Sequence, residues 1–558
     1  MQAMRRFAIH VAIRVARTVM PLCLLVAMAP TAHAQVDPRG AMRTIAMPHF
    51  RVHFRPDQEA LARRAALLAE TAYAQLSREL APPSGLVDLL IADNVDASNG
   101  YAQVFPTNRV VIYAVPPIAL RELRFHDEWL RMVITHEMAH IFQIDRARGA
   151  WALGRVVFGR NPLFFPNALT PSWVKEGLAV HYESKFTGSG RSVSTGFPMI
   201  ARTAVRDAFV PSPQRWSLST SQFPGGQTAY AWGTLLMNRS AMQRDGGMRR
   251  FVDITAANVV PFLLSRNSRQ AFGASFDSLF ARMTDSLRLV STALPGDSVW
   301  HAVSANGWYA ASPRWVGVDS IVWSASNGRE VTGLYIAPAG RADVVAPRRL
   351  AWRNTLDVNA PVPGDTSGAM VFAQSERLDP YVVRSDLYRS RRGDRGGETR
   401  LTKGARLSQP DVRADGSIVA VQLGADRSRL VRVSATGDSI GPITPDVLSE
   451  RWAEPRWSPD GQRIAAVQLL ATGEQRWKTP RADKPKGGWN TPRVIDLPSH
   501  RELIVNGEFG VRAYNPKTGK ELWFCEGFNG RGTPVPAWGN GVLELGTFLA
   551  IIGGTVAG

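Results

Sequence analysis

The stretch DEWLRMVITHEMAHIFQIDRA, residues 127–147, contains His136, Glu137 and His140 in the order HExxH. Apolar residues recur through it at helical spacing, which predicts an amphipathic helix packed into a core. Residues four apart lie on one face of a helix, so the two imidazoles can hold one zinc ion. Glu137 is placed to take a proton from a water molecule at the metal. The stretch therefore predicts hydrolytic chemistry, and the alternative is a core helix that binds no metal.

A second stretch, PSWVKEGLAVHYE at residues 171–183, supplies a carboxylate for the same site. Its first residues favour a helix N-terminus, which places Glu176 on a following helix. A carboxylate is a regular zinc ligand beside two histidines, so we predict a site made of His136, His140 and Glu176. His181 lies five residues after Glu176, off the ligand's face, and is expected to be a surface or core histidine.

The two stretches together resemble the gluzincin metallopeptidases, which follow HExxH with a glutamate in the setting W-x-x-E-G-x-A-x-x-x-E. Here the setting is formed by Trp173, Glu176, Gly177, Ala179 and Glu183. The resemblance implies that the two histidines of the first stretch and Glu176 bind zinc, with Glu137 as the general base. It also implies that Glu183 supports the ligands without touching the metal.

A third match is AYAWGTLLMNRS, residues 229–240, which contains Tyr230-x-x-Gly233. It resembles the tyrosine segment of the aminopeptidase-like gluzincins, whose phenol stabilises the oxyanion, and the alternative for Tyr230 is a packed core aromatic. The chain departs from that branch in two ways, because 35 residues separate His140 from Glu176 and no G-x-M-E-N motif lies upstream. We therefore expect cleavage within peptides, and an aminopeptidase is the alternative.

The surrounding sequence predicts the other elements of an α+β domain. Pro56–Leu80 has apolar residues at helical spacing, and helical spacing returns from Thr234 to about Leu289. Val87–Ile91 and Arg109–Ala114 are predicted to be strands, with a turn at Asn99–Gly100 between them. The resemblance implies that the second strand forms the rim of the cleft, where an edge strand accepts an extended peptide.

Between the two motif helices lies Trp151–Leu169, which contains VVFGRNPLFFPNAL and is unusually apolar for a connection. Apolar loops are usually buried against other elements. We therefore expect this segment to pack over the two helices as a lid or a wall of the site. Contact with a membrane surface is the alternative.

Residues 1–34 are interpreted as a cleaved signal peptide. Four arginines precede an apolar run from Val19 to Met28, and Ala32-His33-Ala34 suits a cleavage site. The run is too short to span a bilayer as a stable helix. We expect an exported chain that begins at Gln35, is periplasmic or secreted, and has no transmembrane helix.

Composition limits what the mature chain can be. Of two cysteines, Cys23 leaves with the signal peptide and Cys525 remains, so no intramolecular disulfide is expected. The 558 residues, 45% of them hydrophobic, suffice for more than one core. The formal charge of +19 falls to +15 without the four arginines of the signal peptide, and the excess is spread along the sequence. No basic stripe interleaved with aromatics is present, which argues against nucleic-acid binding.

From about Ala293, short runs of Val, Ile, Trp and Tyr are separated by Gly, Asp and Ser, which is typical of strands. A pattern recurs in steps of 48, 49 and 45 residues, at Pro313, Pro361, Pro410 and Pro455. Such periods indicate propeller blades. RADGSIVAV from Arg413 and WSPDGQRIAAV from Trp457 resemble the TolB-like propeller repeat. We expect four such units in residues 293–475, the fourth incomplete.

After Gln475 the pattern changes. YNPKTGKELW, residues 514–523, resembles the tryptophan-docking blade of quinoprotein-type propellers, with Trp523 packing between blades. We interpret residues 476–558 as a quinoprotein-type propeller segment that is truncated or composite, with no bound quinone. The expected fold class is multidomain, with an α+β gluzincin peptidase domain at residues 35–292 followed by an all-β propeller region.

These features together predict an exported zinc metallopeptidase with a peptide or protein substrate. The propeller region is expected to position or screen substrates and to offer a surface to an envelope protein. The alternative class is a non-catalytic envelope binding or scaffold protein that works through the propeller. Because Glu137 is present, the enzyme is favoured.

Overall fold

The structure is a computed structural model, and it describes residues 37–118, 123, 126–218, 224–260, 263–291, 309–339, 347–352, 359–364, 369–390, 398–448, 450–470, 492–507, 509–526, 537–539, 542–544 and 556–557. The predicted signal peptide lies outside the described residues. By its internal contacts the chain divides into two compact units, Met1–Ala471 and Thr472–Gly558.

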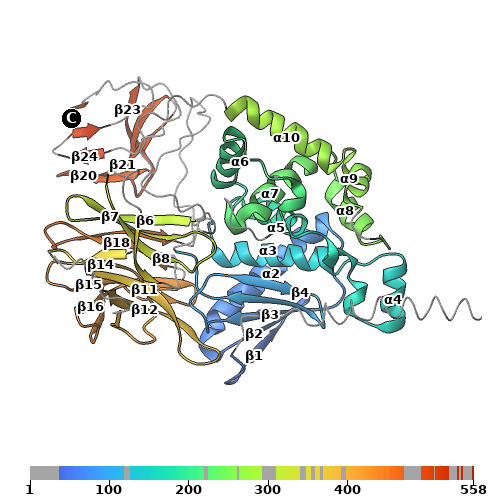
Figure 1. Cartoon of the computed structure of the whole chain (residues 1–558), viewed down its shortest axis with the longest axis horizontal. Helices are drawn as coiled ribbons and strands as arrows, with labels where there is room; N and C mark the ends of the chain where they lie inside the picture. The colour runs from blue at the N-terminus through green and yellow to red at the C-terminus, as the bar shows by residue number, and fades with distance from the viewer. Residues whose placement is uncertain are drawn as a thin grey trace, which may run out of the picture. The chain divides into compact units, whose positions relative to one another are not determined.

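A five-stranded sheet with the order β1-β2-β3-β5-β4 underlies the N-terminal part of the first unit (Figure 1). Its strands are β1 (Arg43–Ala46), β2 (Phe50–Phe54), β3 (Val87–Ala92), β4 (Gly100–Gln103) and β5 (Asn108–Tyr113). β2, β3 and β5 run parallel, and β3 and β5 are largely buried, as parallel strands rich in Val, Leu and Ile generally are. β4 pairs antiparallel with β5.

The expectation that Arg109–Ala114 is the edge strand was wrong. β5 lies between β3 and β4, so the open edge at this side of the sheet belongs to β4. The predicted turn at Asn99–Gly100 was also wrong, because Gly100 is the first residue of β4. The signal for β4 is weak, since its four residues GYAQ contain one aromatic and no β-branched side chain.

Helices cover the sheet and then extend the domain. They include α2 (Glu59–Glu79), α3 (Trp129–Ile144), α5 (Ser172–Thr187), α6 (Gly196–Arg206), α7 (Thr228–Ala241), α8 (Gly247–Thr255), α9 (Leu264–Phe272) and α10 (Phe276–Ser291). Figure 1 shows α3 between the sheet and the pair α5 and α7. The predicted helix at Pro56–Leu80 is confirmed by the 3-10 turn η1 (Pro56–Gln58) and α2, and the predicted helical region from Thr234 by α7 to α10.

The stretch that contains HExxH is the most buried helix of this part. Every residue of α3 from Met132 to Gln143 is buried. Its first residue, Trp129, donates its indole N–H to the carbonyl of Tyr113 at the end of β5, at 3.3 Å. The helix therefore lies in the core, and both of its histidines are buried.

The apolar segment between the motif helices differs from the expectation. It forms α4 (Ala150–Phe158) and the short turns η2 (Pro162–Phe164) and η3 (Pro166–Leu169), and only residues of the last part, such as Phe165, are buried. No residue of α4 is buried, and Phe158 is 73% exposed. The prediction that the segment packs over the metal helices was therefore wrong for α4.

Among the described residues from Tyr309 onward, every element of regular secondary structure is a strand. Three consecutive four-stranded antiparallel sheets comprise β6 to β9 (Tyr309–Val316, Ser320–Ser326, Gly333–Pro338, Arg348–Trp352), β10 to β13 (Asn359–Pro361, Met370–Arg377, Val383–Ser390, Thr399–Arg400) and β14 to β17 (Leu407–Val412, Ile418–Gly424, Arg427–Val433, Ile440–Pro442). A two-stranded sheet, β18 and β19 (Glu450–Trp457 and Ile464–Leu470), follows. These sheets are propeller-like, and within the described residues they do not close into a ring.

The recurring prolines mark the same place in successive sheets. Each lies on the first strand of its sheet, at β6, β10, β14 and β18. In three of the four strands the pairing shifts at this point, and the residue before the proline has a positive φ, namely Ser312, Gln409 and Glu454. Proline has no N–H for the ladder, so a bulge is where a strand tolerates it. The predicted period is thus confirmed as a structural repeat.

Arginines of the blades bind two aspartates just after β3 in the α+β part. Arg406 donates to both carboxylate oxygens of Asp93, at 2.6 and 2.9 Å, and to Asp96 at 2.9 Å. Arg384 donates to the same Asp96 at 2.8 Å. Side-chain ion pairs therefore join the α+β part to the blades inside the first unit.

The second unit contains a four-stranded antiparallel sheet, β20 to β23 (Arg493–Asp496, Arg501–Asn506, Gly510–Tyr514, Glu521–Glu526), and three short strands, β24 to β26 (Ala537–Gly539, Val542–Glu544, Val556–Ala557). Trp523 packs against the core of its own sheet and donates its indole N–H to Glu502 at 2.8 Å. In the part of the chain that the structure describes, no helix combines the length and the apolar character that crossing a membrane requires.

Candidate metal centre

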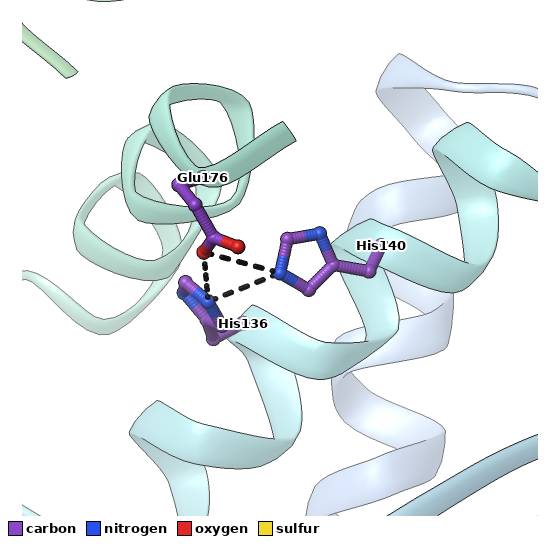
Figure 2. A group of neighbouring side chains, drawn as sticks. All are labelled: His136, His140 and Glu176. Atoms are coloured by element: carbon purple, nitrogen blue, oxygen red, sulfur yellow. Dashed lines mark hydrogen bonds and ion pairs between the residues drawn. The ribbon is translucent and has the colours of Figure 1, made fainter. Parts of the chain in front are cut away.

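Three side chains predicted as ligands converge on one point (Figure 2). His136 and His140 come from successive turns of α3, and Glu176 comes from the second turn of α5. The two Nε2 atoms lie 3.2 Å apart, and Oε2 of Glu176 lies 3.4 Å from that of His136 and 3.5 Å from that of His140. The three atoms therefore form a nearly equilateral triangle.

The triangle fits a zinc ion. Ligand atoms at about 2.0–2.1 Å from one tetrahedral zinc lie about 3.3 Å from each other, which matches its three sides. Two nitrogens and one carboxylate oxygen are also a donor set that zinc accepts. Oε2 of Glu176 is buried without a hydrogen-bond donor among the described residues, which is costly unless a cation is present.

Glu183 and Arg191 lie behind His136, on the side away from the triangle. Oε2 of Glu183 is 3.0 Å from Nδ1 of His136, and the guanidinium of Arg191 contacts both oxygens of Glu183, at 2.5 and 3.3 Å. Nη2 of Arg191 is also 2.9 Å from that Nδ1. If Nδ1 of His136 donates its proton to Glu183, it cannot also accept a hydrogen bond from Arg191. The guanidinium of Arg191 therefore donates to Glu183 only. This assignment leaves the Nε2 lone pair of His136 facing the triangle.

Charge and burial act in opposite directions on this group. Burial alone would raise the pKa of Glu183, but the charge of Arg191 and the hydrogen bond from His136 lower it to about 2. Burial and Arg191 lower the pKa of His136, yet the neighbouring carboxylates of Glu176 and Glu183 raise it to about 9. The two carboxylates therefore favour a positive charge at His136.

Glu137 points its carboxylate toward β4. A Cβ placed on Gly100, the first residue of β4, would stand 3.2 Å from Oε1 of Glu137 and 2.7 Å from a methyl of Val133. A larger residue at this position would collide with α3. Burial raises the pKa of Glu137, and the nearby charges of His136 and His140 counteract part of that shift.

The group opens into a cavity of about 410 Å³. Gly100, Tyr101 and Ala102 of the edge strand line it, together with the metal group, Glu137 and Tyr230. Tyr230, on the first turn of α7, packs its ring partly against the core beside α5, and its phenol pKa is raised by burial and by the charge of Glu176. The structure thus places Tyr230 at the cavity and not wholly within the core.

His181 and His126 lie apart from the triangle. Nδ1 of His181 is 2.8 Å from Oδ1 of Asn238, and His126 contacts Arg451 at 3.4 Å. Neither belongs to the group of side chains that could hold a metal among the described residues.

Sequence reasoning missed Arg191. Its backbone N–H and its side chain both bond Glu183, because the chain turns back after α5 through Gly188 and Gly190, both with positive φ. A Cβ on Gly190 would stand 2.7 Å from Oε1 of Glu183. The two glycines, five and seven residues beyond Glu183, were the available signal, since they predict a tight return of the chain.

No protein-family model matches the chain, and no curated protein matches its sequence. Solved structures with some similarity include TolB from Acinetobacter baumannii, with 15% identity, 40% of this chain and 45% of that chain covered, and a TM-score of 0.23. A puromycin-hydrolyzing peptidase of Mycobacterium tuberculosis has 19% identity, 45% and 37% covered, and a TM-score of 0.24. Yeast LTA4 hydrolase in complex with bestatin has 14% identity, 48% and 42% covered, and a TM-score of 0.24. The matches span less than half of each of these proteins, and at these TM-scores they carry no argument about this chain.

Proposed function

We propose that residues 35–292 form a zinc-dependent peptidase domain of the gluzincin type, which hydrolyses bonds within peptide chains. One observation carries the proposal: the triangle of His136, His140 and Glu176 lies in a cavity that also holds Glu137 and is bordered by an edge strand. Zinc bound there would supply a Lewis acid that polarises the peptide carbonyl and lowers the pKa of water.

Glu137 is the group proposed to move protons. Its buried carboxylate has a raised pKa, so it is a stronger base than a solvated glutamate. It would take a proton from the attacking water and pass it to the leaving amine. A carboxylate within the cavity and outside the ligand triangle suits both steps.

Two further groups would assist. The phenol of Tyr230 would donate to the oxyanion that develops on the peptide carbonyl, since the ring reaches the cavity beside Glu176. The ion pair of Arg191 with Glu183 would hold the ring of His136 in its ligand orientation. Arg191 acts through Glu183 in this scheme and is a positioning residue.

The edge strand β4 supports cleavage within chains. An extended peptide can add to an open edge through main-chain hydrogen bonds, and Gly100, Tyr101 and Ala102 of this edge line the cavity. Such binding holds a peptide along its length and needs no free terminus. It therefore favours an endopeptidase over an aminopeptidase.

Metal analysis of the purified mature protein with a peptidase assay tests this proposal. We expect one zinc per chain in the wild type and in Glu137→Gln, with activity lost in Glu137→Gln. His140→Ala should lose the metal, whereas the matched variant His181→Ala should keep it. Unchanged metal in His140→Ala would overturn the ligand site, and full activity in Glu137→Gln would show that Glu137 is not the general base. A wild type without peptidase activity would return the chain to the class of non-catalytic binding proteins.

We also infer an exported chain whose residues 1–34 are removed and whose residues 293–475 form TolB-like blades. Residues 476–558 would form a quinoprotein-type segment. The blades would position or screen substrates and contact an envelope protein. The composition of residues 1–34 and the period of the blades support this organisation.

A further inference from the structure

Helix α4 presents its apolar side chains to solvent. Val156 is 83% exposed and Phe158 73% exposed, and Leu153 and Val157 are each more than 60% exposed. Leu163 follows in η2 and is exposed as well. Surface helices normally turn apolar residues toward the core, so an apolar face that points to solvent indicates an interaction surface.

The polar side chains of α4 face inward and fix this orientation. The guanidinium of Arg155 donates to the carbonyl oxygens of Asp145 at 2.6 Å and Phe164 at 2.8 Å. Trp151 donates its indole N–H to the carbonyl of Asn258 at 2.6 Å. Arg160, two residues past the helix, pairs with the buried carboxylate of Asp145 at 2.9 Å. The apolar face is therefore held outward by specific bonds.

The same region carries an excess of positive charge. Residues 146–175 contain five cations, Arg146, Arg148, Arg155, Arg160 and Lys175, and no acidic residue. Asp145 pairs with both Arg155 and Arg160, and Asp253 of α8 pairs with both Arg146 and Arg148. Each carboxylate therefore balances only one of two positive charges. A net positive charge remains beside the apolar side chains.

A second segment extends this surface. The backbone N–H of Arg148 donates to the carbonyl of Ala256, which brings the start of α4 next to the end of α8. Figure 1 shows α4, α8 and α9 on the same side of the helical part. Val259 and Val260, just beyond, are 65% and 62% exposed, and residues 254–276 again contain arginines but no acidic residue.

We propose that the α4 patch, defined as Leu153, Val156, Val157, Phe158, Leu163, Val259 and Val260, docks the protein on an anionic lipid surface. Apolar side chains of an interfacial helix enter the boundary between headgroups and acyl chains, and the net positive charge beside the patch, where Arg148 is half exposed, attracts anionic headgroups. A second copy of the chain fits less well. A two-fold interface would set the same excess of arginines against itself, and like charges oppose contact.

The test is flotation of the full mature chain with vesicles of phosphatidylcholine alone or mixed with phosphatidylglycerol. We expect binding to the anionic vesicles, weaker binding to phosphatidylcholine, and a decrease as salt is raised. The double variant Val156→Asp, Phe158→Asp should lower the bound fraction about tenfold or more. Val318→Asp is the matched control, since Val318 is 97% exposed in a β6–β7 turn away from the patch, and should bind as the wild type does.

The changed side chains are exposed, so the double variant should unfold at the same temperature as the wild type, which separates loss of docking from loss of folding. The proposal is overturned if the double variant binds vesicles as well as the wild type does, or if the wild type binds none. A wild type that binds no vesicles but forms a dimer which the double variant dissociates would assign the patch to self-association. None of these readouts depends on peptidase activity.

Discussion

Gly177 of α5 and Gly233 of α7 meet backbone to backbone. A Cβ on Gly177 would stand 2.5 Å from the carbonyl of Gly233, and a Cβ on Gly233 would stand 2.4 Å from the carbonyl oxygen of Trp173. The two helices can approach this closely only because both residues lack a side chain. The contact lies one residue after Glu176 and three after Tyr230, so it sets the distance between the candidate ligand and the candidate phenol.

Gly177→Ala should therefore separate α5 from α7. We expect a loss of about 1–3 kcal/mol in the free energy of unfolding from overpacking, together with a fall in peptidase turnover larger than the fall in zinc content. Gly226→Ala is the matched control, since no atom lies within 4 Å of a Cβ built there. Chemical denaturation and turnover measured on both variants check the prediction, and equal stability of the two would contradict the close contact.

Tyr230→Phe removes one hydroxyl and changes little volume. If that hydroxyl donates to the oxyanion, turnover should fall about a hundredfold or more, while zinc content and substrate affinity stay near those of the wild type. Steady-state kinetics and metal analysis of the variant measure this. Near-normal turnover would show that Tyr230 serves only to pack the core beside α5.

Arg191→Gln removes a charge from a buried pair and leaves Glu183 with fewer partners. We expect the affinity for zinc, measured by competition with a chelator, to fall about 10- to 100-fold, because His136 is held less firmly. A second replacement, Glu183→Gln, should restore part of the folding stability, since it removes the unpaired buried charge. If zinc affinity in Arg191→Gln equals that of the wild type, Arg191 stabilises the fold only and does not position His136.

The ligand group was predictable because its geometry is local. Two histidines one turn apart on a helix share a face in any fold, and the setting around Glu176 carries its own sequence signature. The site residue that was missed, Arg191, reaches Glu183 through a reversal of the chain, and an arginine in a loop has no distinctive spacing. Gly188 and Gly190 indicate the reversal, but not which side chain it brings back to Glu183, eight residues before Arg191.

The two wrong expectations have separate physical causes. β5 was predicted to be the rim because the resemblance places that strand there, whereas β4, which covers it, has a weak sequence signal and is held as a strand by its pairing with β5. The apolar composition of α4 predicted burial, but the bonds of Arg155 and Trp151 turn the helix the other way. Hydrophobic periodicity does not predict hydrogen bonds of this kind.

His126 makes stability depend on pH. Burial lowers its pKa from 6.5 to about 4, and the charge of Arg451 adds to this, against opposing effects of Asp127 and Glu183. Between pH 6.5 and 4, His126 is protonated in the unfolded chain and neutral in the folded one. The free energy of unfolding therefore decreases as the pH falls through this range, by up to about 1.4 kcal/mol per pH unit. His126→Gln should flatten this part of the curve of unfolding free energy against pH. Parallel curves for wild type and variant would show that His126 does not cause the loss.

The mode of cleavage follows from the edge strand. If β4 holds substrates by their main chain, a peptide acetylated at its amino terminus should be cut as fast as the same peptide with a free amine, and at the same internal bonds. Mass spectrometry of the fragments from the two matched peptides compares them directly. Gly100→Val is a second arm of the test. A Cβ at this position already meets Val133 at 2.7 Å, so the larger side chain should distort β4 at the cavity and slow both peptides equally. Stepwise removal of single residues from the free peptide alone would instead establish an aminopeptidase. It would also show that β4 does not hold the substrate by its main chain.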